Sequence, residues 1–153
     1  MSAAVRVVHE SGDRFTVETR GHVITVDQPI ADGGTDLGAS PTDLFVAALA
    51  SCVAHYARRF LDRHGLPDEV TVDAGWTMTS SPRRVDSIQV FVRAPGLPGA
   101  LESRFTKVIE HCTVHNTLMA RPDVTISLEA SARGGSLSRR EGMIRHEGEG
   151  LDL

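Results

Sequence analysis

The chain contains two cysteines, Cys52 and Cys112, and each belongs to an apolar stretch with a helical pattern. If both helices pack on one sheet, the cysteines can come within disulfide reach, which requires a Cα separation of roughly 4.4 to 6.8 Å. In such a pair, one thiolate attacks an electrophile such as a peroxide oxygen and becomes a sulfenic acid, which the second thiol captures as a disulfide. A reductant then reopens the disulfide. The residues alone do not indicate which cysteine attacks.

Two other interpretations of the cysteines stand beside this one. Free cysteine is among the most buried residue types, so both can simply be core residues. Each cysteine is also followed three residues later by a histidine, His55 or His115, and four such ligands suit tetrahedral zinc. The zinc interpretation is the less favoured one, because Cys52 and His55 lie in a helix whose apolar packing already stabilises it. Structural zinc usually stabilises loops that have little hydrophobic core of their own.

A reactive Cys52 would need help to ionise, because burial in an apolar helix raises the pKa of a thiol. His55 lies one helical turn away on the same side, although it also reads as an ordinary residue of the helix surface. Arg14 and Arg20, on the predicted first strands, are the other candidates for a nearby cation.

The element that holds Cys52 is a long helix predicted over residues 41–64. Ser40 is its predicted N-cap, and Pro41 suits the first helical position because its φ angle is preset. Asp43 stands where a capping box places an acid.

This helix has no polar face in its first half, since only Ser51 is polar over residues 44–54. The pattern predicts a buried helix. At 1.5 Å per residue its length is roughly 36 Å, which a domain of this size covers with difficulty unless a second subunit contributes. The sequence therefore indicates a dimer.

The rest of the chain predicts an α+β fold, with strands and helices segregated along the sequence. Alternation at Val70, Val72, Ala74, Trp76 and Met78 predicts a strand with one buried face. Strands are predicted over residues 4–9, 15–20, 22–26, 70–78, 85–92 and 124–130, a second helix over 101–112 and a turn over 114–119. We expect a single domain over residues 1–130, followed by a polar, loosely held tail over 131–153.

Composition and charge narrow the possible partners. The 153 residues carry a formal net charge of −4, and their basic side chains are distributed rather than gathered. We therefore expect a small-molecule partner, no nucleic acid and no membrane. The segment from Met1 to Val8 is too short and too polar for a signal peptide. No apolar run reaches the roughly 18 residues that a membrane-spanning helix needs. These features predict a cytoplasmic protein.

Several motifs together resemble the OsmC/Ohr family of peroxide-reducing proteins. They are GGTD at residues 33–36, GASPTDL at 38–44, AALASC at 47–52 and CTVHNTL at 112–118. With Asp27, Gln28 and Pro29 before them, the resemblance extends from about His22 to Ala130. Thr42 stands where the best-studied branches have glutamate, and Thr113 where proline is common, so the resemblance is to a divergent OsmC-like branch.

The resemblance implies an OsmC-like fold, in which antiparallel sheets wrap around a long central helix in an intertwined homodimer with active sites at the subunit interface. It also implies that Cys52 is the peroxidatic thiol and Cys112 the resolving one, with Arg20 or Arg14 favouring the thiolate and Asp43 orienting that arginine. The implied substrate is an organic hydroperoxide, and the implied reductant is a thiol or a lipoyl-type dithiol.

The resulting hypothesis is a cysteine-based hydroperoxide reductase of oxidative-stress defence that works without metal, flavin or haem. The alternative is a non-catalytic OsmC-fold protein that binds a small molecule or a partner and whose cysteines are only core.

Overall fold

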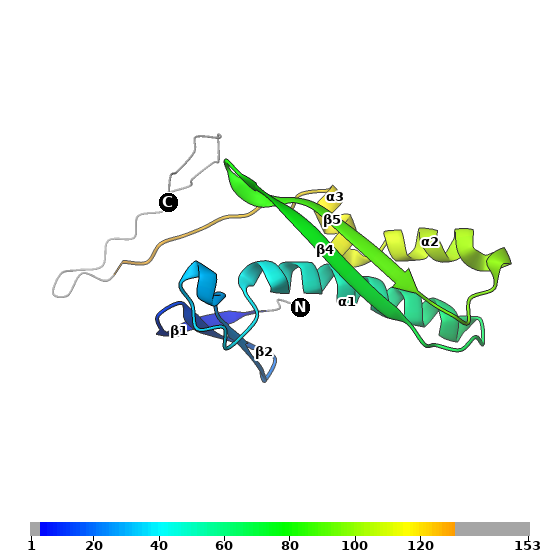
Figure 1. Ribbon diagram of the computed structural model, residues 1–153, viewed down its shortest axis with the longest axis horizontal. Coiled ribbons are helices and arrows are strands. Elements are labelled where there is room, and N and C mark those ends of the chain that lie inside the picture. Colours follow the sequence, from blue (N-terminus) through cyan, green and yellow to red (C-terminus); the bar gives the residue numbers. More distant parts are fainter. Residues whose placement is uncertain (1–3, 131–153) are drawn as a thin grey trace.

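The computed structural model describes residues 4–130, and the predicted tail over 131–153 lies outside this range. Figure 1 shows a long central helix flanked by strands and two shorter helices. In chain order the elements are β1 (Arg6–Ser11), β2 (Arg14–Thr19), β3 (His22–Val26), η1 (Ile30–Asp32), α1 (Pro41–Arg63), β4 (Thr71–Ser80), β5 (Arg83–Arg93), η2 (Gly99–Leu101), α2 (Glu102–Glu110) and α3 (Thr113–Met119). The predicted α+β class is confirmed.

The first three predicted strands are confirmed, and they form an antiparallel meander in the order β1-β2-β3. Gly12 and Gly21 form its two turns with φ angles of +56° and +82°, a region that glycine enters without a steric cost. The turn residues thus fix where each strand ends.

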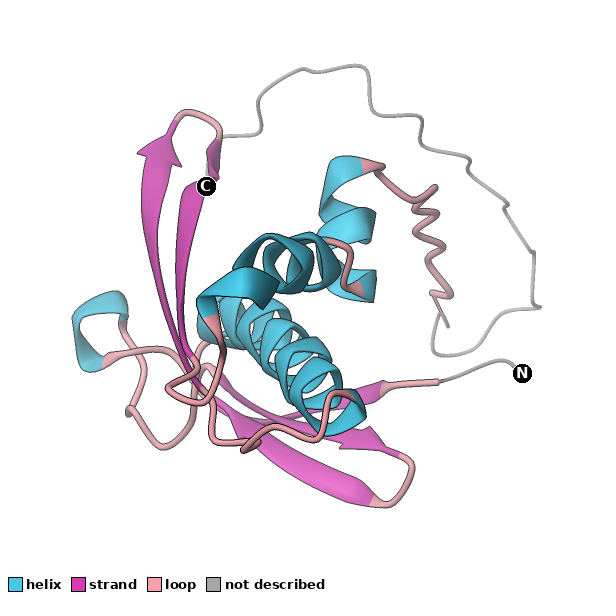
Figure 2. Cartoon of the chain, turned by 90° about the vertical axis from the view of Figure 1, so that its right-hand side faces the viewer, coloured by secondary structure: helices cyan, strands magenta, loops and turns pink. Residues whose placement is uncertain are grey.

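The second sheet is the long antiparallel hairpin of β4 and β5. Helix α1 packs against this hairpin and against α2 and α3, so that it lies between a strand layer and a helix layer (Figure 2). Its core face contributes Ala57, Phe60 and Leu61, which contact the buried Phe105 of α2. Helix α1 therefore carries the core of the domain. The prediction that its first half is buried on all sides is wrong for the described chain, because Phe45, Ala47 and Ala48 are exposed and no described element packs on them.

The predicted buried face of β4 is confirmed only at its inner end. Val72 packs against α1, whereas Trp76 and Met78 are 37% and 42% exposed. The outer end of the hairpin extends beyond the helices in Figure 1. Trp76 and Met78 are therefore left partly uncovered by the elements of residues 4–130. Periodicity identifies the strand but not the length of its covered part.

Two predictions near the end of the domain are wrong. Residues 121–130 form no strand, and Val124, Ile126 and Leu128 are 74%, 71% and 84% exposed, because this segment pairs with neither sheet of the single chain. Residues 114–119 belong to α3 and not to a turn. Alternation of apolar side chains indicates that a segment can form a strand, but it does not indicate which other strand pairs with it.

The second predicted helix is shorter than its pattern. It ends as α2 at Glu110, and Cys112 takes an extended conformation, with φ −66° and ψ 151°, as the N-cap of α3. Cys112 is therefore placed by a helix start and not by a helix interior.

Helix α1 is the single described helix that is long and apolar enough to cross a membrane by length and composition. Core helices of soluble proteins meet the same criterion.

Candidate thiol site

Helix α1 begins with the predicted capping box. The Ser40 hydroxyl accepts a hydrogen bond from the Asp43 amide at 3.2 Å, and the Asp43 carboxylate accepts one from the Ser40 amide at 2.8 Å. These reciprocal bonds satisfy two backbone donors that the helix leaves unpaired. They fix the start of the helix three turns before Cys52.

The loop before α1 is built on the buried carboxylate of Asp27. Its oxygens accept hydrogen bonds from the amides of Gln28 at 2.8 Å, of Thr35 at 3.1 Å and of Leu37 at 3.1 Å, as well as from the Thr35 hydroxyl. The Thr35 hydroxyl lowers the pKa of Asp27 most, desolvation opposes it, and the amides of Leu37, Gln28 and Thr35 lower it further. One carboxylate thus holds the loop that leads into the helix.

Two glycines of the same loop are required by close approach of the backbone. A Cβ atom on Gly34 would lie 2.0 Å from the Gln28 carbonyl oxygen, and one on Gly38 would lie 2.4 Å from that of Thr25. At Gly38 the loop lies against β3, at Gly34 it lies against the segment that follows β3, and Val26 pairs with Ala39 in a parallel bridge. The glycine-rich sequence before the helix is therefore a packing requirement.

The two cysteines lie in one apolar cluster. Leu49, Val53 and Cys112 are its buried members, and Cys52 is a half-buried side chain packed against them. Both cysteines are free thiols. The structure therefore brings together two residues that are 60 positions apart in the sequence, since 112 − 52 = 60.

Burial raises the pKa of the Cys112 thiol above its ordinary value, and the neighbouring Cys52 raises it further. The amide of His115, which lies 3.5 Å from the Cys112 sulfur, acts in the opposite direction. Cys112 thus keeps its proton more readily than an exposed thiol does, which makes it the poorer attacking nucleophile.

A hydrogen bond next to the thiols joins the two helices that position them. The hydroxyls of Tyr56 and Thr113 are 3.1 Å apart. Tyr56 lies one helical turn after Cys52, and Thr113 directly follows Cys112, so this bond holds α1 against the start of α3.

The other predicted site residues lie apart from the thiols. Arg14 donates to the Ser11 hydroxyl at 3.0 Å within the first turn, and Arg20 lies exposed in the second turn with φ +50°. Among residues 4–130, no hydrogen bond or ion pair joins either arginine to Cys52 or Asp43. The single chain brings the two cysteines together but not the arginines.

The cysteines and histidines of the alternative zinc interpretation do not converge within the described part of the chain, which contains no group of three or more side chains able to hold a metal. His55 is exposed with its ring edge-on to Tyr56, and the His115 ring bonds the Glu110 carbonyl. His55 therefore has the position of an ordinary helix-surface residue.

The sequence did not predict the role of Asp27, which holds the loop before α1 through its hydrogen bonds. It stands before a glycine-rich loop, where an aspartate is ordinarily interpreted as a turn residue. A buried carboxylate that collects several donors becomes recognisable only in the folded loop, because its donors come from residues up to ten positions away.

The fold and the site define an α+β protein with two antiparallel sheets and a long helix. This helix carries one thiol beside a second, buried one. Residues 33–127 match the family of OsmC-like proteins, and since they make up more than half of the chain, the protein belongs to this family.

Solved structures with the same fold have low sequence identity to the chain. A putative osmotic stress induced and detoxification response protein from Psychrobacter arcticus superposes with a TM-score of 0.67 at 21% identity, covering 74% of this chain and 85% of that one. The organic hydroperoxide resistance protein OsmC from Legionella pneumophila gives 0.63 at 18% identity, with 78% and 90% covered. OhrB, the organic hydroperoxide resistance protein of Bacillus subtilis, gives 0.56 at 16%, with 79% and 93% covered. No curated protein is significantly similar to the chain in sequence.

Proposed function

We propose that this protein is a thiol-dependent reductase of hydroperoxides, with Cys52 as the attacking thiol and Cys112 as the resolving one. The observation that carries the proposal is the packing of two free cysteines from distant parts of the chain in one apolar cluster. Similarity to structures named as organic hydroperoxide resistance proteins supports the same reaction class. We also propose a cytoplasmic role in oxidative-stress defence.

The reduction of a hydroperoxide by the two cysteines takes place in three steps. The Cys52 thiolate attacks one oxygen of ROOH, so that an S–O bond forms, the O–O bond breaks, and the departing alkoxide takes a proton to leave as ROH. Cys112 then attacks the sulfenic sulfur, an S–S bond forms, and the hydroxyl group leaves with the proton of Cys112 as water. Two thiols, or one lipoyl-type dithiol, supply the two electrons and two protons that reopen the disulfide, and they are themselves oxidised to a disulfide.

The assignment of roles follows from burial. The half-buried Cys52 is the more accessible of the two sulfurs, and the raised pKa of the buried Cys112 favours its protonated form. Apolar neighbours such as Leu49 and Val53 suit the alkyl part of an organic hydroperoxide. Hydrogen peroxide, which has no such part, is the weaker candidate.

The ionisation of Cys52 still requires a cation, and we propose that Arg20 or Arg14 supplies it in a homodimer. Phe45, Ala47 and Ala48 on the first half of α1 are exposed in the single chain. The apolar side chains at 124, 126 and 128 are also uncovered. A second copy that buries both surfaces would place further residues beside the thiols, including the loop arginines and a carboxylate such as Asp43 to orient them.

The experiment that tests the reaction is peptide mass spectrometry of the reduced full chain after treatment with cumene hydroperoxide. We expect a disulfide between Cys52 and Cys112, a sulfenic acid on Cys52 in the Cys112→Ser variant, and no oxidation of Cys112 in the Cys52→Ser variant. A parallel reaction with hydrogen peroxide should be slower.

If both thiols stay free in the folded protein, the reductase proposal is wrong. The alternative is then a binding protein whose cysteines are core residues, which the full burial of Cys112 favours. Oxidation of Cys112 in Cys52→Ser, with turnover retained, would reverse the proposed roles.

Sedimentation of the full chain tests the homodimer. We expect a dimer at micromolar concentration and its dissociation in the Ile126→Asp variant, because a charge on that side chain opposes burial. Asp123→Asn changes a charge in the same segment and should leave the dimer intact. A wild-type monomer would contradict this part of the proposal.

A further inference from the structure

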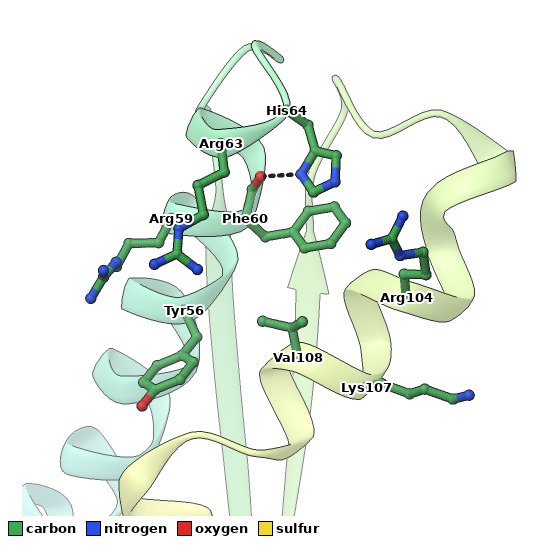
Figure 3. A pocket seen from close by; sticks show the side chains of 8 residues that line it. All are labelled: Tyr56, Arg59, Phe60, Arg63, His64, Arg104, Lys107 and Val108. Atoms are coloured by element: carbon green, nitrogen blue, oxygen red, sulfur yellow. Dashed lines mark hydrogen bonds between the residues drawn. The ribbon is translucent and has the colours of Figure 1, made fainter.

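A cavity of about 560 Å³ lies between the second half of α1 and the outer face of α2 (Figure 3). Its apolar lining includes Phe60, which is 5% exposed, and Val108, which is 36% exposed, together with Tyr56. The ring of His64, also in the lining, is stacked on the ring of Phe60 with a centroid distance of 4.1 Å. A volume of this size falls within the range of small-molecule pockets. The cavity includes neither Cys52 nor Cys112 among its lining residues.

Four cationic side chains line the same cavity, two from each helix: Arg59 and Arg63 of α1, and Arg104 and Lys107 of α2. No carboxylate from residues 4–130 lines the cavity, and none of the ion pairs in that part of the chain includes these four side chains. In a chain with a net charge of −4, this is a local concentration of unpaired positive charge.

The helices themselves do not account for this arrangement. Arg63 stands in the last turn of α1, where a cation stabilises the helix dipole. Arg104, by contrast, stands in the first turn of α2, where the dipole opposes a cation. Arg59 and Arg63 are also like charges four residues apart, which slightly destabilises a helix. A bound anion would offset both the repulsion between the like charges and the unfavourable interaction of Arg104 with the helix dipole.

The positions of the side chains suggest how such an anion is held. In Figure 3 the guanidinium group of Arg104 lies toward the ring of Phe60, Arg63 extends along α1 in the direction of Tyr56, and the side chains of Arg59 and Lys107 extend outward. Guanidinium groups match the geometry of carboxylate and phosphate oxygens, and both helices contribute such a group to the lining of this cavity. The outer two cations add to the attraction of an approaching anion.

We propose that this cavity binds an amphipathic anion, with its carboxylate or phosphate head held among the cations of the two helices, Arg63 and Arg104 included, and its alkyl body along the apolar lining that includes Val108. Tyr56, one helical turn after Cys52, also lines the cavity, but neither thiol does, and the site does not depend on the proposed peroxide chemistry. Its ligand is a small organic acid or phosphate monoester with an apolar chain.

Isothermal titration calorimetry of the reduced full chain tests the proposal with four probes below their micelle concentrations: decanoate, decyl phosphate, inorganic phosphate and decanol. We expect saturable binding of the two alkyl anions, and their relative affinities identify which head group the site prefers. Inorganic phosphate and decanol should each bind more weakly by about tenfold or more, because inorganic phosphate lacks the alkyl chain and decanol lacks the anionic head group.

The variant Arg63→Gln/Arg104→Gln should weaken binding of the preferred alkyl anion by about tenfold or more, because it removes two charge-assisted hydrogen bonds. The control Arg84→Gln/Arg121→Gln removes the same charge outside the cavity and should change the Kd less than about twofold, since distant charges are screened. Cys52→Ser should bind like the wild type.

Three results would overturn the proposal. They are the absence of saturable binding to the folded wild type, an unchanged Kd in the Arg63→Gln/Arg104→Gln variant, and an affinity for decanol or inorganic phosphate equal to that for the alkyl anions. The calorimetry measures binding to a protein whose thiols are reduced, so an absence of anion binding would not contradict the proposed peroxide reaction. An absence of peroxide reaction would likewise not contradict the proposed anion site.

Discussion

The hydroxyl of Tyr56 lies 3.1 Å from the hydroxyl of Thr113, and this contact joins the helix that carries Cys52 to the helix that begins after Cys112. Disulfide formation requires the two sulfurs to approach within a narrow geometry. A bond between the residues beside them restricts their relative motion.

Tyr56→Phe should therefore slow formation of the intramolecular disulfide up to about fivefold, the effect of a typical hydrogen bond of about 1 kcal/mol. The measurement is the rate of disulfide formation after a pulse of cumene hydroperoxide. Thr113→Val should give a similar loss, and the double variant should be no slower than either single one, because all three lack the same bond. Additive losses would show that the two hydroxyls act independently.

The two thiols should differ in their reactivity toward iodoacetamide, which reacts with the thiolate. Burial and the raised pKa of Cys112 both protect it, so Cys52 should be alkylated first in the reduced, folded protein at a pH of about 7.5. Peptide mass spectrometry over time measures the two rates. In guanidinium chloride the difference should disappear, and a faster reaction of Cys112 in the folded state would contradict the roles proposed here.

The Asp27 carboxylate should make stability depend on acid pH. Its folded pKa lies below the ordinary value of 3.8, so the folded state binds the proton more weakly than the unfolded chain. The contribution to stability is fully present above about pH 4 and is lost as the pH falls through the folded pKa.

Asp27→Asn should lower Tm at pH 7 by roughly 3 to 8 °C, because the amide cannot accept all of the hydrogen bonds that the carboxylate collects. The difference from wild type should shrink as the pH falls below about 4, in thermal unfolding followed by circular dichroism. Asp36→Asn, an exposed change in the same loop, serves as the control. A difference that stays constant over the whole acid range would rule out this ionisation as the cause.

Gly34 should tolerate no side chain. Gly34→Ala places a Cβ atom 2.0 Å from a backbone oxygen, and the shift needed to relieve this contact should cost about 1–3 kcal/mol of unfolding free energy. Urea unfolding measures this loss. Gly75→Ala is the matched control, since a Cβ there meets nothing within 4 Å. Equal stability of the two variants would mean that the loop moves freely away from Gln28.

Asp43 has two candidate roles, as a helix cap and as the partner of an arginine. The cap predicts that Asp43→Ala and Ser40→Ala each lower the unfolding free energy by about 1 kcal/mol, with a double variant less destabilised than the sum. Urea unfolding and peroxide turnover are measured together. A loss of turnover with unchanged stability would instead support the arginine role, and Ser51→Ala, in the helix interior, is the control for both.

Much of the local structure could be predicted from the sequence. Ser40, Pro41 and Asp43 determine the start of α1, because capping depends on neighbours within one turn. Alternating side chains determine the strands of the meander and the hairpin, since a strand repeats every two residues. The motifs around Cys52 and Cys112 also identify the OsmC-like family, because a motif is a property of the residue order alone.

Tertiary structure alone decided the relationships between distant residues. It placed Cys112 at the start of a helix beside Cys52, it gave Asp27 its donors from the folded loop, and it gathered cations of α1 and α2 around one cavity. It also left residues 124–130 without a neighbouring strand. Sequence periodicity reports which face of a segment is apolar, whereas packing determines which other segment meets that face, and this depends on the path of the whole chain.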